Sequence, residues 1–142
     1  MSFGQAASRP KGFATVRGAD PCPCGSGAAF DGCCAPILAG TPAETAERLM
    51  RSRYSAFVVG DERHLAETWH PRTRPEAIDL DPALRWTGLE IIRANEGSAD
   101  DTRGTVEFRA RWRDGATSGA LHESSRFTRY AGRWWYVDGD VE

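Results

Sequence analysis

The spacing of hydrophobic residues changes along the chain, from a helical period to an alternating one. Between residues 41 and 60 the apolar positions recur three or four residues apart, which predicts an amphipathic helix. Thr41 can cap this helix, Pro42 suits its first position, and Glu44 can complete a capping box. A second helix is predicted over residues 62–69.

From Trp86 onward the apolar positions recur every second residue, as expected for strands with one buried face. The alternation is clearest over residues 105–113, and the pairs Asp114-Gly115 and Ala131-Gly132 are turn signals. This pattern predicts a four-stranded antiparallel meander. Two helices followed by a meander favour an α+β fold, with the helices packed on one face of a curved antiparallel sheet.

Four cysteines lie within thirteen residues, as Cys22-Pro23-Cys24 and Cys33-Cys34, separated by a glycine-containing loop. Four thiolates around one ion form a closed tetrahedral site, which is the pattern of structural zinc. Iron is an alternative, because soft thiolate ligands do not choose between the two metals. Ordinary buried cysteines or disulfides are less compatible with such tight clustering, and neighbouring cysteines pair only with strain.

Length, composition and charge bear on the domain organisation and the location of the protein. The 142 residues suit one ordinary domain with a short extra module: a flexible tail over 1–20, a metal module over 21–36 and an α+β domain over 41–140. The formal charge of −2 argues against a nucleic-acid-binding role. No apolar run is long enough for a membrane helix or a signal peptide, so we expect a cytoplasmic protein with reduced cysteines.

The cysteine segment also resembles a known motif. The run Cys22-Pro23-Cys24-Gly25-Ser26-Gly27, followed by Phe30 and Cys33-Cys34, is similar to the SEC-C motif of the SecA translocation motor. That module binds zinc and contacts the chaperone SecB. The resemblance implies zinc at Cys22, Cys24, Cys33 and Cys34, and a protein partner bound through the module. The lysines usual in this loop are replaced here by Ala28, Ala29 and Asp31.

The rest of the chain resembles the YchJ-like family, which joins a SEC-C motif to an NTF2-like domain. The resemblance is carried by a series of segments in one order: Leu49 to Phe57, Thr68 to Pro71, Trp86 with Gly88-Leu89, Val106 to Phe108, His122 to Phe127, and Trp134 to Gly139. It implies a cystatin-like cone of helices on a strongly bent sheet, with a cavity between them. It implies no activity, because none is established for the family and a fold does not define a function.

One carboxylate is expected inside that cavity. Glu123 shares a strand face with Leu121 and Phe127, whereas His122 is expected to face away. A carboxylate on an apolar face needs a partner, and Arg53 on the first helix is the expected one. The pair could be a structural ion pair, or it could anchor a ligand or act in acid–base chemistry. The predicted pocket is lined by Glu123, Arg53, Tyr54, Trp69, Trp86 and Trp112.

The two other histidines are expected to have structural or surface roles. His70 precedes Pro71 and is expected to cap the end of the second helix, while His64 is expected on the surface.

Three functions fit these features. The leading hypothesis is a non-catalytic metal-binding adaptor for a protein partner or a small ligand. The alternatives are an enzyme of the isomerase or dehydratase kind that uses Glu123 as a base, and an intracellular protein that handles zinc or iron. No convincing set of nucleophile, base and orienting group is evident in the sequence.

Overall fold

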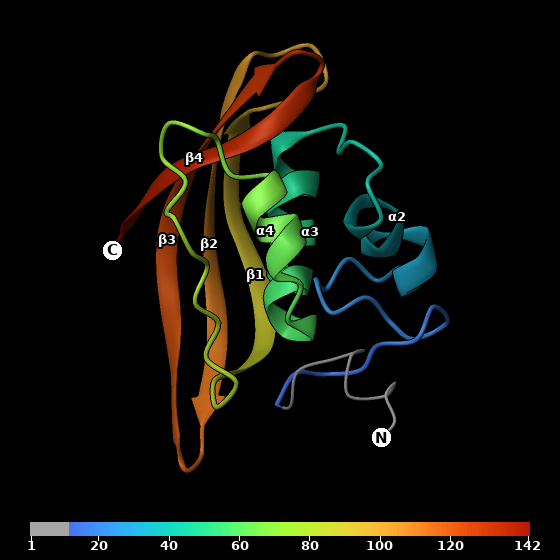
Figure 1. Ribbon diagram of the computed structural model, residues 1–142, viewed down its shortest axis with the longest axis vertical. Coiled ribbons are helices and arrows are strands. Elements are labelled where there is room, and N and C mark those ends of the chain that lie inside the picture. Colours follow the sequence, from blue (N-terminus) through green and yellow to red (C-terminus); the bar gives the residue numbers. More distant parts are fainter. Residues whose placement is uncertain (1–11) are drawn as a thin grey trace.

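The computed structural model describes residues 12–142 and shows helices packed on one face of an antiparallel sheet (Figure 1). The sheet is a meander of four strands in the order β1-β2-β3-β4. Its strands are β1 (Arg85–Glu96), β2 (Arg103–Asp114), β3 (Thr117–Tyr130) and β4 (Arg133–Val141). The helices are η1 (Phe30–Gly32), α2 (Cys34–Leu38), α3 (Ala46–Val59) and α4 (Glu62–Glu67). The predicted α+β class and strand order are therefore confirmed.

Helix α3 lies at the centre of the molecule. In Figure 1 the sheet lies on one side of it and the segment that contains α2 lies on the other. The helix begins at Ala46 and not near Thr41, because Thr45 is the capping residue: its Oγ1 accepts from the Arg48 amide at 3.0 Å. The amide of Thr41 instead donates to the Pro36 carbonyl and closes the end of α2.

The predicted second helix is two residues too long. Helix α4 ends at Glu67, and the chain then runs beside β4. The Tyr136 amide donates to the Thr68 carbonyl, and the His70 amide donates to the Tyr136 carbonyl, both at 2.8 Å. Pairing with a strand satisfies these backbone groups and fixes Trp69 against the sheet.

Local irregularities curve the sheet around the helices. Register shifts occur twice between β1 and β2, and once between β3 and β4 at Arg126 and Phe127. Such bulges bend a strand and increase its twist. The hairpin between β3 and β4 turns through Ala131 and Gly132, both with positive φ, as the turn signal predicts.

The predicted tail over 1–20 falls partly outside the described residues, which begin at residue 12. Residues 12–20 differ from the prediction of a flexible tail, because they bond to the rest of the protein. The Ala14 amide donates to the Val58 carbonyl at 3.0 Å, and the Phe30 amide donates to the Asp20 carbonyl at 2.8 Å. This segment is therefore anchored to both α3 and the cysteine loop.

The cysteine segment and the α+β region share one core. A continuous cluster of buried side chains extends from the four cysteines through Leu49 and Tyr54 of α3 to Val106 and Phe127 of the sheet. The two predicted units are therefore packed against each other through α3.

Candidate functional site

The four cysteine sulfurs form a compact, buried cluster. All four Sγ atoms lie within 4.8 Å of one another, and the cysteines are 0–4% exposed. The Sγ atoms of Cys24 and Cys33 are 3.7 Å apart. A tetrahedral ion with metal–sulfur bonds of about 2.3 Å would set its ligands about 3.8 Å apart, so the arrangement fits one bound metal ion.

A tight turn and a short helix bring the two cysteine pairs together. Pro21 bridges Ala29, and the Cys22 amide donates to the Ala28 carbonyl at 2.9 Å, which folds the loop back on itself. Gly25 makes this reversal possible with a φ of 79°. The second pair lies where η1 ends and α2 begins.

Two polar side chains, Ser26 and Arg51, lie beside the cluster. The Ser26 hydroxyl lies 3.1 Å from the Cys33 sulfur. Arg51 Nη1 donates to the Cys24 carbonyl at 2.7 Å, and its Nε pairs with Glu47 at 3.0 Å. Four thiolates around a divalent ion carry a net charge of −2, so a guanidinium beside the cluster is favourable.

The thiols of the cluster do not ionise equally. Hydrogen bonds from Cys22 and Cys34 lower the pKa of Cys24, while the bond with Cys22 raises the pKa of Cys34. Binding of a cation favours deprotonation of the thiols.

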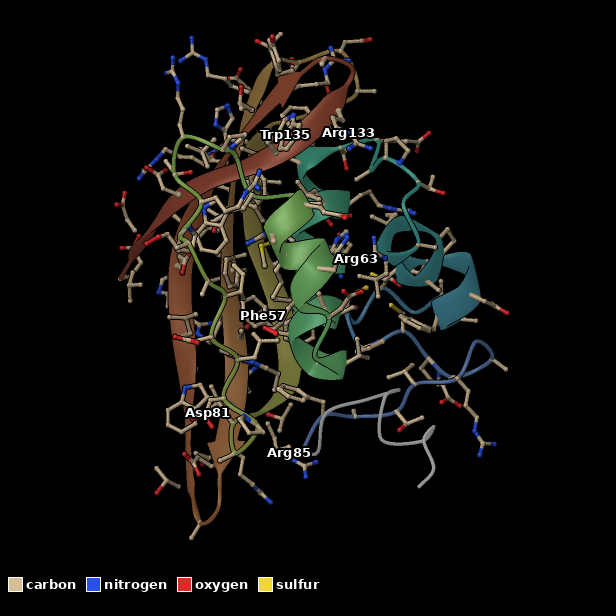
Figure 2. The ribbon with its side chains drawn as sticks, viewed as in Figure 1. Phe57, Arg63, Asp81, Arg85, Arg133 and Trp135 are labelled. Atoms are coloured by element: carbon tan, nitrogen blue, oxygen red, sulfur yellow. The ribbon has the colours of Figure 1, made fainter. Side chains whose placement is uncertain are left out.

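A second candidate site is a cavity of about 240 Å³ between α3 and the sheet. Phe57 points from α3 into the space between helix and sheet in Figure 2. Residues three, four and seven apart on α3 form one wall, since they share a helix face. The lining is Met50, Arg53, Tyr54, Phe57, Trp69, Trp86, Phe108, Ala110, Leu121, Glu123, Ser125 and Tyr136.

Glu123 faces this cavity, in the strand register that the sequence predicts. Its Oε2 accepts from the Ser125 hydroxyl at 2.8 Å and from the Tyr136 hydroxyl at 3.5 Å. His122 points to the opposite face of the sheet, where its Nε2 lies 2.7 Å from a Glu107 carboxylate oxygen. Burial raises the pKa of Tyr136 to about 12, so its hydroxyl remains a donor at neutral pH.

The predicted ion pair between Glu123 and Arg53 is not formed. Among the ion pairs of residues 12–142, none includes Arg53. Its Nη1 donates instead to the Leu65 carbonyl at 2.9 Å and to Thr68 Oγ1 at 2.7 Å. The guanidinium also lies 4.3 Å from the Tyr136 ring centre. These contacts explain how a cation that is only 4% exposed is tolerated without a bound carboxylate.

Burial lowers the pKa of Arg53 to about 10, so the side chain is still charged at neutral pH. Arg53 and Glu123 therefore both contribute charge to the cavity wall, although they do not contact each other directly.

Of the predicted pocket residues, Trp112 is the one that does not line the cavity. It follows Ala110 on the same face of β2, but further toward the β2–β3 hairpin. Its ring packs over Gly119 on β3, where a Cβ atom would lie 2.7 Å from the indole. Alternation assigns Trp112 to the correct face of the sheet, but alternation does not show how far along the strand the cavity extends.

His64 is a buried residue that the sequence analysis places on the surface. It is 4% exposed, and its Nε2 lies 2.9 Å from the Ser52 hydroxyl. Because that hydroxyl donates to the Leu49 carbonyl, it accepts from Nε2–H, which sets the tautomer. Burial lowers the pKa of His64 to about 4. The spacing of apolar residues gives no signal for this burial, because the nearest apolar residue, Leu65, is adjacent to His64 and does not share its helix face.

His70 also differs from its predicted role as a cap of α4. Its Nδ1 accepts from the Arg72 amide at 3.1 Å, within the turn that follows the helix. Its ring packs edge-on against Trp135 of β4. His70 therefore stabilises the connection to the sheet.

Within the described part of the chain, no helix has the length and hydrophobicity needed to cross a membrane.

Comparison with known proteins agrees with the fold and the cysteine cluster. Residues 45–139 match the family model described as the middle NTF2-like domain of YchJ. A UPF0225 protein of Streptomyces coelicolor is 56% identical over 121 residues, covering 84% of this chain and 94% of that protein. A UPF0225 protein of Chromobacterium violaceum is 50% identical over 125 residues, covering 84% and 92%.

Two solved structures are similar to this one. The solution structure of RPA3114, a SEC-C motif containing protein from Rhodopseudomonas palustris, has a TM-score of 0.75 and 36% identity, covering 85% of this chain and 98% of that one. The crystal structure of a SEC-C motif containing protein from Psychrobacter arcticus has a TM-score of 0.72 and 26% identity, covering 88% and 84%.

Fold and site together define a protein in which a SEC-C type cysteine cluster is packed against an NTF2-like α+β cone. The chain belongs to the YchJ-like family, whose relatives include the UPF0225 proteins.

Proposed function

We propose that this protein is a non-catalytic binding protein whose N-terminal module is held in place by structural zinc. The observation that carries the proposal is the set of four buried cysteine sulfurs within 4.8 Å of one another. Four thiolates complete the coordination of zinc and leave no position for a substrate, so the ion stabilises structure. Iron is the alternative metal, because the same ligands accept it.

Burial of the cluster favours a structural ion over a transported one. Cys24 and Cys34 are at most 1% exposed, and Arg51 of α3 donates a hydrogen bond to the Cys24 carbonyl. A carrier must release its metal to a partner, which requires accessible ligands. The metal-handling hypothesis is therefore less consistent with the cluster.

The proposed binding role involves two parts of the molecule, the metal module and the cavity. The module would present a folded surface to a protein partner, and the cavity would bind a small ligand. A mostly apolar cavity with a few polar groups is the usual form of a small-molecule site. The cytoplasm is the expected location, since reduced thiols are required for the metal.

A second candidate function is catalysis in the cavity. The observation that favours it is the carboxylate of Glu123, placed in an apolar cavity beside the hydroxyls of Ser125 and Tyr136. A carboxylate in such a setting can act as a general base.

Metal analysis of the purified protein tests the proposal. We expect about one zinc ion per chain in protein purified under reducing conditions, and loss of metal in Cys33→Ser. The matched control is Ser26→Ala, which removes the hydroxyl beside the Cys33 sulfur but keeps all four thiolates. Protein that contains no metal and takes up none on reconstitution would overturn the structural-zinc proposal.

Mass spectrometry of small molecules released from the same preparation separates the two functions of the cavity. An unchanged ligand recovered in stoichiometric amount supports binding. A mixture of two chemically related compounds that interconvert when the protein is added back supports catalysis.

A further inference from the structure

One polar group on the wall of the cone cavity has unused hydrogen-bonding capacity. Glu123 uses only Oε2 for its bonds to Ser125 and Tyr136, and among residues 12–142 no donor contacts Oε1. A carboxylate oxygen on an apolar wall without a donor is costly, so Glu123 Oε1 is a group that a ligand would satisfy.

The neighbours of Glu123 on the same wall hold its carboxylate in place. Oε2 is fixed by the hydroxyls of Ser125 and Tyr136, at 2.8 Å and 3.5 Å, which leaves Oε1 to accept from a ligand. A hydroxyl group can donate to such an oxygen.

The charge of the cavity favours a neutral ligand. Arg53 and Glu123 are the charged residues in the lining, and their charges cancel. A cationic ligand that approached Glu123 would be repelled by the buried Arg53, and an anionic ligand would be repelled by Glu123. The remaining walls are aromatic or aliphatic and favour a ring.

The volume sets the size of the ligand. A cavity of about 150 Å³ is known to take benzene, so about 240 Å³ accommodates one substituted ring. We propose that the cone cavity binds a neutral, single-ring molecule with a hydroxyl group that donates to Glu123. This inference rests on the proposed binding role of the cavity.

The test uses p-cresol and p-xylene, which have the same shape and differ by a hydroxyl in place of a methyl group. Each is titrated into the full, metal-loaded protein while the tryptophan indole N–H resonances are followed by NMR. The resonances of the two tryptophans in the lining are assigned by their loss in Trp69→Phe and Trp86→Phe. We expect both ligands to shift these resonances through their rings, and p-cresol to bind about fivefold or more tightly than p-xylene.

The ratio of the two affinities measures the contribution of the carboxylate. In Glu123→Gln, preference for p-cresol over p-xylene should fall about fivefold or more, because a neutral amide accepts a weaker hydrogen bond than a carboxylate. Glu107→Gln is the matched control, since Glu107 lies on the opposite sheet face beside His122, and it should leave the ratio unchanged. An equal ratio in the wild type and in Glu123→Gln would overturn the role given to Glu123.

Charged probes of similar size separate failure of the ligand class from failure of the binding role. If benzylammonium or benzoate binds more tightly than p-cresol, the neutral class is wrong, while the cavity remains a binding site. If none of the four probes shifts a cavity tryptophan, both the inference and the proposed cavity role are wrong. The zinc proposal is decided separately by metal content.

Discussion

The carboxylate of Glu123 lies in the space that a Cβ atom on Gly139 would occupy. A Cβ built on Gly139 would be 2.8 Å from the carboxyl carbon of Glu123 and would also overlap its Oε2. Gly139 pairs across the sheet with Ser125, whose hydroxyl donates to that same oxygen. The absence of a side chain on β4 therefore allows the carboxylate of β3 to take its position.

Replacing Gly139 with alanine should displace Glu123. We expect a loss of about 1–3 kcal/mol in the free energy of unfolding, the usual cost of overpacking, measured by urea denaturation. Gly88→Ala is the matched control, because Gly88 also lies in a strand but has nothing within 4 Å of its added Cβ. Its effect should stay within about 0.5 kcal/mol.

The same clash can be tested by a double variant. If Glu123 is the group that collides, Glu123→Ala should remove most of the penalty of Gly139→Ala, and the two losses should not add. Additive losses would show that the alanine strains some other contact.

A second prediction follows from the absence of an ion pair between Glu123 and Arg53. Because Arg53 has its own partners at Leu65 and Thr68, Glu123→Gln leaves no unpaired buried cation. We expect this substitution to cost less than about 1 kcal/mol in the free energy of unfolding. A cost of about 3–5 kcal/mol, typical of a broken buried pair, would instead support the pairing that the sequence suggested.

Replacing Arg53 should lower the free energy of unfolding far more than replacing Glu123. Arg53→Met breaks two hydrogen bonds and the contact with the Tyr136 ring, and we expect a loss of about 3 kcal/mol in chemical denaturation. Arg63→Met is the control, since the Arg63 side chain is 63% exposed and extends from α4 in Figure 2. An exposed pair of this kind contributes at most about 1 kcal/mol.

Local patterns were sufficient to predict the class of fold and the face on which Glu123 lies. Strand alternation depends on neighbouring residues alone, so it could separate Glu123 from His122. The partner of Glu123 could not be found in this way. Arg53 comes from the right helix face, but its contacts depend on where α4 ends and on how Trp69 and Tyr136 stack, which are tertiary features.

The start of α3 and the burial of His64 also depend on tertiary contacts, which local sequence patterns do not reveal. Thr41 and Thr45 are both acceptable caps, and the choice was decided by the packing of Ala46 against the β1–β2 connection, where its amide donates to the Gly97 carbonyl at 3.0 Å. His64 lies in the first turn of a short helix, a position that is exposed unless another segment covers it. The cover is α3, through Ser52.

The buried His64 should make stability depend on pH. Its pKa is about 4 in the folded protein and about 6.5 when unfolded, so between these values the unfolded chain binds the extra proton. The contribution of His64 to the free energy of unfolding is therefore fully present above about pH 6.5 and is lost as the pH falls toward 4. At pH 5 we expect the free energy of unfolding to be about 2 kcal/mol lower than at pH 7.

Comparison with His64→Gln isolates this effect from acid release of the metal. Glutamine can still donate a hydrogen bond to Ser52 but does not titrate, and both proteins lose metal by the same route. Urea denaturation at a series of pH values should show a shallower decline for the variant. Equal slopes between pH 7 and pH 5 would mean that His64 is not the group responsible.

The last prediction concerns whether the metal module and the α+β region unfold independently. Their shared core suggests that loss of the metal weakens the whole chain, whereas the sheet has many buried residues of its own. We expect Cys33→Ser to lower the free energy of unfolding by at least about 2 kcal/mol.

Hydrogen exchange by mass spectrometry can locate that loss. In Cys33→Ser, amide protection should disappear over residues 21–38, where the turn and α2 depend on the metal, and should persist in β2 and β3. Ser55 of α3, which lies 3.7 Å from the Cys22 sulfur, marks the boundary between the two regions. Loss of protection in the sheet at the same rate as in residues 21–38 would show that the module and the cone form a single cooperative unit.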